Sequence, residues 1–96
     1  MNAGSSEVLA RRFVARGRVQ GVGYRDYVRR RAAQIGVRGY IRNERDGSVF
    51  AYATGTRSQL ADFEAALREG SAMADVRRLE MVDCPAEPHP SFSIRR

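Results

Sequence analysis

The order of hydrophobic periodicities along the chain constrains its fold more than any other feature. Apolar and polar residues alternate from Phe13 to Val19, which predicts a strand with one buried face. Apolar residues then recur at helical spacing from Tyr24 to Ile35, which predicts an amphipathic helix. Gly36 follows at the position of a left-handed C-cap. A second alternating segment, Val37 to Asn43, predicts another strand.

A hairpin and a second helix are predicted in the rest of the chain. Asp46-Gly47 is typical of a tight turn, and Val49 to Ala53 is predicted to be the returning strand. Thr56 and Gln59 have the spacing of a capping box, and they precede an apolar stripe that predicts a helix ending at Gly70. The remaining alternating segments predict a fourth strand and a short fifth strand, over Val76–Asp83 and Phe92–Ile94.

This order of elements predicts an α+β fold of the ferredoxin-like, split βαβ type. In such a βαββαβ sandwich two helices cover one face of an antiparallel sheet, and here a short fifth strand is added. The other face is expected to lie near solvent and to carry basic side chains, among them Arg16, Arg18, Arg38 and Arg42. Because unrelated activities occur on this fold, function must be argued from particular residues.

Length and composition agree with one small domain. The 96 residues are 43% hydrophobic, which is enough for one modest core. We expect residues 1–10 to be a short flexible leader and residues 11–96 to be the domain. No apolar run approaches the ~20 residues of a membrane-spanning helix. The lone Cys84 excludes an intrachain disulfide and fits a reducing compartment, so a soluble, cytoplasmic protein without membrane contact is expected.

The basic residues, all of them arginine, are concentrated in the first half of the chain. Arg11 to Arg45 contains eleven arginines against two carboxylates, a local balance of +9. Asp46 to Ile94 contains four arginines against eight carboxylates, a balance of −4. This asymmetry suggests that the first half handles an anion. The alternative is an arginine-rich surface that is only solvated.

The segment Gly17–Arg25, between the first strand and the first helix, is a candidate anion site. It contains three glycines in seven positions. Such a loop lets consecutive backbone N–H groups converge on an anion, and the helix N-terminus adds partial positive charge. Arg25, in the first helical turn, can bind the same phosphate or carboxylate in a bidentate manner. The alternative is a tight connection whose glycines serve backbone geometry alone. Walker and dinucleotide patterns are absent.

Two motifs resemble the signatures of the acylphosphatase family. Gly17–Arg25 is similar to the first signature, G-x-V-Q-G-V-x-x-R. The second signature is matched by Gly39-Tyr40-Ile41-Arg42-Asn43, followed by Asp46-Gly47-Ser48-Val49 and by Gly55. The resemblance extends from about Phe13 to the C-terminal Ser-Phe-Ser-Ile segment. Two positions depart from the family pattern, Gly23 in place of a frequent aromatic residue and Glu44 in place of a frequent threonine.

The resemblance implies hydrolysis of the carboxyl-phosphate anhydride bond of small acyl phosphates, on a ferredoxin-like fold and without metal or organic cofactor. Arg25 would hold the phosphate, and Asn43 would hold the attacking water. Backbone N–H groups of the loop would complete the phosphate site, with Gln20, Gly21, Val22, Gly23, Tyr24 and Arg25 as its residues. Inorganic phosphate is expected as product or competitive inhibitor. A monomer is expected.

Physical reasoning supports this chemistry. The leaving group of an acyl phosphate is a carboxylate, so no general acid is required. Phosphoryl transfer spreads charge over equatorial oxygens, which suits N–H donors and one guanidinium. The Asn43 amide has both a donor and an acceptor, so it can orient water, whose proton can pass to a phosphate oxygen of the substrate. The alternative for Asn43 is a turn-entry residue that bonds its own backbone.

Two other functions are open at this point. RNA-recognition domains share this strand order, but the stretch from Asp46 to Tyr52 offers only Phe50 and Tyr52 as aromatic residues. We therefore do not expect nucleic acid as a partner. The other candidate is an anion sensor that binds phosphate without turnover. Hydrolysis of an acyl phosphate distinguishes the enzyme from both.

Overall fold

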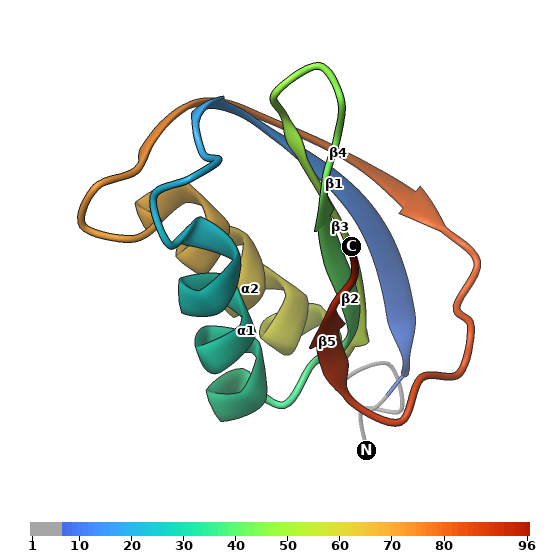
Figure 1. The fold of residues 1–96 in the computed structure, drawn as a ribbon. Helices are drawn as coiled ribbons and strands as arrows, with labels where there is room; N and C mark the ends of the chain where they lie inside the picture. The colour runs from blue at the N-terminus through green and yellow to red at the C-terminus, as the bar shows by residue number, and fades with distance from the viewer. Residues whose placement is uncertain (1–6) are drawn as a thin grey trace.

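The computed structural model describes residues 7–96, in which the elements follow the predicted order (Figure 1). They are β1 (Leu9–Arg18), α1 (Tyr24–Ile35), β2 (Arg38–Asn43), β3 (Val49–Gly55), α2 (Arg57–Glu69), β4 (Asp75–Cys84) and β5 (Phe92–Ile94). The strand order is β4-β1-β3-β2-β5, and both helices pack on one face of the sheet. The predicted ferredoxin-like α+β fold is confirmed. Neither described helix is long and apolar enough to cross a membrane.

The fifth strand changes the character of the sheet. The pairs β1–β3, β1–β4 and β2–β3 are antiparallel, but β5 runs parallel to β2. This follows from the connection after β4, which crosses from one edge of the sheet to the other. The sheet is therefore mixed, and Arg95, the residue after β5, lies beside β2, where its N–H donates to the Ile41 carbonyl at 2.8 Å.

The first strand begins earlier than the alternating pattern indicates. β1 starts at Leu9, and the buried Ala10 pairs with Thr54 on one side and Cys84 on the other. The predicted boundary between leader and domain therefore falls inside a strand. Residues 1–6 of the predicted leader lie outside the described residues.

The core lies between the sheet and the two helices. Its largest fully buried side chains include Phe13, Tyr24, Ile41, Leu60 and Phe63. The predicted C-terminus of α1 and N-terminus of α2 are confirmed. Gly36 caps α1 in the left-handed region, and Thr56 and Gln59 form the capping box of α2. The buried side chains of both helices pack against the sheet and so position the loop that precedes α1.

Replacing Gly39 with alanine is expected to destabilise the sheet. Gly39 has φ of +141°, and an added Cβ would lie 1.9 Å from the carbonyl oxygen of Tyr52. We expect Gly39→Ala to lower the free energy of unfolding by about 2 to 4 kcal/mol, because it combines backbone strain with displacement of β3. Urea unfolding measures this loss.

Gly47→Ala is the matched control. Gly47 also has positive φ, +91°, but nothing lies within 4 Å of its added Cβ. Strain alone should cost about 1 kcal/mol. Equal losses in both variants would show that the contact with Tyr52 contributes nothing.

Candidate active site

The glycine-rich loop connects β1 to α1, as predicted. Gly21 and Gly23 have φ of +71° and +74°, a conformation that L side chains rarely adopt. Among the described residues, no backbone carbonyl accepts a hydrogen bond from the N–H groups of residues 21–25. These donors precede and begin α1, where helix geometry leaves N–H groups without internal partners. The loop therefore offers consecutive donors to an anion.

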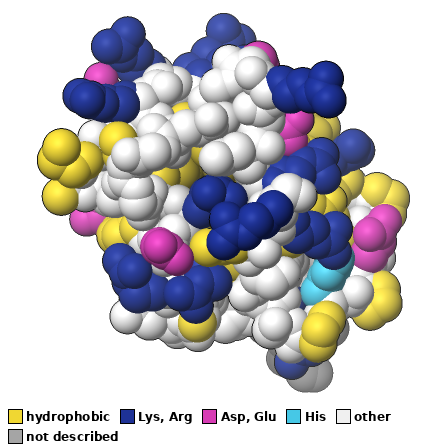
Figure 2. All heavy atoms as spheres, in the orientation of Figure 1, with side chains coloured by type: hydrophobic (Ala, Val, Ile, Leu, Met, Phe, Trp, Pro, Cys, Tyr) yellow, Lys and Arg dark blue, Asp and Glu magenta, His cyan; other side chains and the backbone are white. Residues whose placement is uncertain are grey.

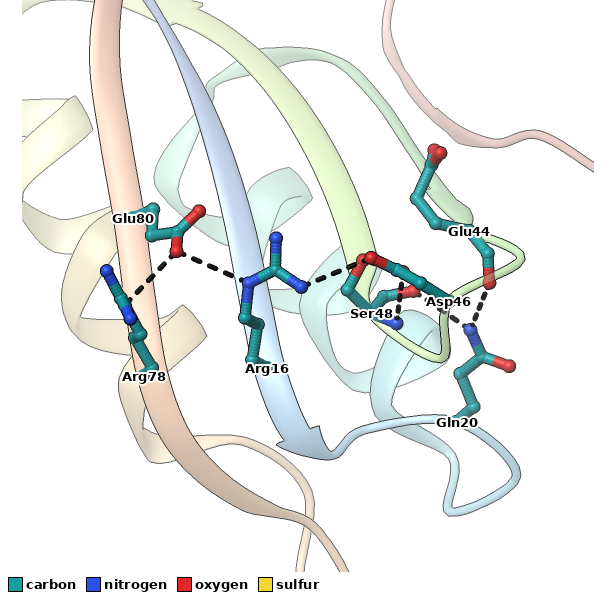
Figure 3. Close-up of polar contacts among 7 residues, drawn as sticks. All are labelled: Arg16, Gln20, Glu44, Asp46, Ser48, Arg78 and Glu80. Carbon is teal, nitrogen blue, oxygen red and sulfur yellow. Dashed lines mark hydrogen bonds and ion pairs between the residues drawn. The ribbon is translucent and has the colours of Figure 1, made fainter.

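The side chain of Gln20 holds this loop against the β2–β3 hairpin. Its Nε2 donates to the carbonyl oxygens of Glu44 and Ser48 at 2.8 and 2.9 Å (Figure 3). Sequence reasoning used only the backbone of Gln20 and missed this contact. No side-chain pattern could reveal it, because both acceptors are main-chain oxygens that lie 24 and 28 residues further along the chain.

The other side of the loop is held from α2 and the turn that follows it. The Ser71 hydroxyl donates to the Val22 carbonyl at 2.8 Å. The buried Tyr24 hydroxyl donates to the Leu67 carbonyl at 2.8 Å. Burial raises the pKa of Tyr24, so this phenol stays protonated as a structural donor. Neither contact uses a backbone N–H group of the loop.

Arg25 and Asn43 belong to different elements, α1 and β2. Arg25 is half-buried in the first turn of α1, and no ion pair or side-chain hydrogen bond joins it to another described residue. Asn43 is exposed at the end of β2, next to Glu44, whose carbonyl binds Gln20. The clamp made by Gln20 thus brings the loop and the hairpin together at one end of the sheet.

Asp46, and not Asn43, secures the hairpin turn. Its Oδ1 accepts from the Ser48 hydroxyl at 2.6 Å and from the Ser48 N–H at 3.0 Å. Its Oδ2 accepts from Arg16 at 3.1 Å, and Arg16 also pairs with Glu80 on β4 (Figure 3). Asp46 makes the turn contacts, and within residues 7–96 the Asn43 side-chain amide forms no hydrogen bond.

The Asp46 carboxylate should titrate far below its usual range. The hydrogen bond from the Ser48 hydroxyl, then that from the Ser48 N–H and that from Arg16, lower its pKa from 3.8 to about 2. Its contribution to stability is therefore complete above the unfolded pKa and is lost as pH falls through about 2. A carboxyl-carbon NMR titration is expected to give a midpoint near 2, and Ser48→Ala should raise it toward 3.8. A wild-type midpoint near 3.8 would contradict this hairpin geometry.

Glu44, one of the two departures from the family pattern, does not direct its charge at the loop. Its Oε2 accepts from Arg42 Nε at 2.6 Å. Figure 3 shows the side chain pointing away from Gln20, while the backbone carbonyl faces it. The carboxylate is therefore paired, and only the main chain of Glu44 takes part in the clamp.

The remaining residues with metal-binding or nucleophilic chemistry lie elsewhere. Within residues 7–96, no three His, Cys, Asp or Glu side chains are placed together as a metal site. His89 packs against Tyr40 and Tyr52, and Cys84 ends β4 opposite Ala10.

Comparisons with known proteins agree with this architecture. A family model described as Acylphosphatase matches residues 11–94. An acylphosphatase from Solibacter usitatus (strain Ellin6076) is 46% identical over 86 residues, which are 90% of each chain. One from Archaeoglobus fulgidus (strain ATCC 49558 / DSM 4304 / JCM 9628 / NBRC 100126 / VC-16) is 37% identical over 87 residues, 91% of this chain and 98% of the relative.

Solved structures show the same similarity. The crystal structure of acylphosphatase from Bacillus subtilis superposes with a TM-score of 0.89 at 34% identity, covering 92% of this chain and 99% of that one. Sequence and fold thus agree over nearly the whole chain. The chain belongs to the acylphosphatase family of hydrolases.

Proposed function

We propose that the protein hydrolyses the carboxyl-phosphate anhydride bond of small acyl phosphates to a carboxylate and inorganic phosphate. Family membership supports acyl phosphate hydrolysis. The observation that carries the mechanism is the row of unpartnered N–H groups over residues 21–25, clamped by Gln20 beside the hairpin that holds Asn43.

In the proposed mechanism, the phosphate group lies on the backbone N–H groups of the loop from Gln20 to Arg25. The Arg25 guanidinium adds a planar pair of donors to the same oxygens. A cation in the first helical turn opposes the helix dipole, and a phosphate between them relieves this conflict. Charge on the equatorial oxygens is stabilised as the transition state forms. The product phosphate fits the same site and should compete with substrate.

Asn43 is proposed to orient the attacking water. Its amide oxygen accepts one water hydrogen and its NH₂ group can donate to the water oxygen. Attack forms a new P–O bond and breaks the bond to the acyl oxygen, and the carboxylate leaves with the electron pair. The water proton passes to a phosphate oxygen, so no protein side chain has to titrate near neutral pH.

Hydrolysis of benzoyl phosphate by purified, chelator-treated protein tests this function. We expect catalysis well above the spontaneous rate and no further increase on adding Mg²⁺, because the carboxylate leaving group needs no Lewis acid. Folded protein that binds phosphate without accelerating hydrolysis would instead be an anion sensor.

We also propose that the protein acts as a cytoplasmic monomer. The lone Cys84 is consistent with a reducing compartment. Gel filtration at assay concentration tests the oligomeric state.

A further inference from the structure

The sheet face opposite the helices carries an aromatic cluster that the proposed mechanism does not use. Tyr40 on β2 lies beside Phe50 and Tyr52 on β3, with ring centroids 6.0 and 5.7 Å away. His89, from the segment before β5, packs against Tyr40 and Tyr52 at 5.6 and 5.4 Å. We refer to Tyr40, Phe50, Tyr52 and His89 as the aromatic platform. It brings together three separate segments of the chain.

Arginine side chains lie on and beside this platform. The guanidinium carbon of Arg95 is 3.8 Å from the ring centre of Tyr40, and that of Arg42 is 4.6 Å from the ring centre of Phe50. Cation–π contacts of this kind hold guanidinium groups over aromatic rings. Arg12 on β1 pairs in register with Tyr52. Figure 2 shows arginine side chains gathered next to the histidine on the β2 and β5 side of the molecule.

The charges of Arg12 and Arg95 are available to a partner. Neither forms an ion pair within the described residues, whereas Arg42 pairs with Glu44. Arg12 and Arg95 are both exposed. Two cations without ion-pair partners therefore flank the half-buried rings of Tyr40 and Phe50.

The platform borders a preformed hollow of about 370 Å³. Its lining includes Arg12, Arg42, Phe50, Tyr52 and Pro85, with Glu87 as an acidic residue in the wall. The Tyr52 hydroxyl donates to the Pro85 carbonyl at 3.0 Å and accepts from the Glu87 N–H at 2.6 Å. These bonds fix the wall, so a ligand would not have to order it.

We propose that this open sheet face binds single-stranded nucleic acid. Unpaired bases would stack on the half-buried Phe50 ring and on the guanidinium planes of Arg42 and Arg95, which lie over Phe50 and Tyr40. Arg12 would pair with a phosphate, and the buried Tyr52 would support the platform from within the sheet. A single strand presents base faces and phosphates together, whereas a duplex hides the faces of its bases. The sequence alone argued against nucleic acid because it offered only Phe50 and Tyr52. The fold adds Tyr40, His89 and the arginines.

Fluorescence anisotropy with a labelled RNA of about 12 nucleotides, a length within the range of known single-strand sites, tests the proposal. Binding is expected at low salt and should weaken as salt rises. Phe50→Leu and Arg95→Gln should each weaken it about tenfold, the effect of losing one stacking or cation–π contact. Arg30→Gln is the matched control, because Arg30 is exposed on α1, away from the platform. It removes the same charge and should leave the affinity nearly unchanged.

Several results would overturn the proposal. These are absence of RNA binding at low salt, equal weakening by Arg30→Gln and Arg95→Gln, and equal affinity for a duplex of the same length. Displacement of the RNA by inorganic phosphate would place it at the Gln20–Arg25 loop instead. Phe50→Leu and Arg95→Gln should retain the wild-type unfolding midpoint and benzoyl phosphate hydrolysis, which separates this face from the proposed active site.

Discussion

Arg25→Gln is expected to abolish inhibition by inorganic phosphate together with turnover. Arg25 lies in the first turn of α1 and has no ion-pair partner among the described residues. The neighbouring loop N–H groups donate no hydrogen bond to a backbone carbonyl of those residues. Glutamine keeps most of the length but removes the charge and the planar fork. We expect kcat/KM for benzoyl phosphate to fall about 10³-fold or more, the range seen when one charged donor to a transferring phosphoryl group is lost.

Two variants separate the geometry of Arg25 from its charge. Arg25→Lys keeps the charge but loses bidentate binding, so it should recover only part of the activity. Arg30→Gln removes an exposed charge elsewhere on α1 and should behave as wild type. If Arg30→Gln were as inactive as Arg25→Gln, the effect would belong to the general basic charge of the helix.

The fold was predictable because its signals are local. The alternation in β1, the apolar stripe of α1 and the Thr56–Gln59 capping box each lie within one element. The parallel pairing of β5 with β2 was not predictable from these signals. It depends on which edge of the sheet the chain reaches after β4.

The candidate site was predictable only in part. The spacing of the glycines and the position of Arg25 directly after them indicate an anion site, because both signals lie within one short segment. The clamp by Gln20 was missed because its acceptors are main-chain carbonyls of a distant hairpin. The aromatic platform was missed for a similar reason, since adjacent strands and the segment before β5 each supply part of it.

Asn43→Ala is expected to remove turnover while leaving phosphate inhibition nearly intact. Asn43 lies on the hairpin, outside the row of loop N–H groups, and no described hydrogen bond ties its amide to the loop or to the turn. Loss of the water-orienting amide should lower kcat about 10²- to 10³-fold, as when one positioned polar donor is removed from a reacting centre. The inhibition constant for inorganic phosphate should stay close to that of wild type, because the cradle and Arg25 are unchanged.

The structure of the hairpin makes this test specific. Asp46 and Ser48 hold the turn, so Asn43→Ala should change the free energy of unfolding by no more than about 0.5 kcal/mol, as for surface substitutions in general. Urea unfolding of the variant checks that the hairpin is intact. If the hairpin of the variant is intact, a loss of turnover reports on the positioning of the water and not on the fold. Equal loss of phosphate affinity in Asn43→Ala and Arg25→Gln would refute the division of roles, because both residues would then be holding the phosphate.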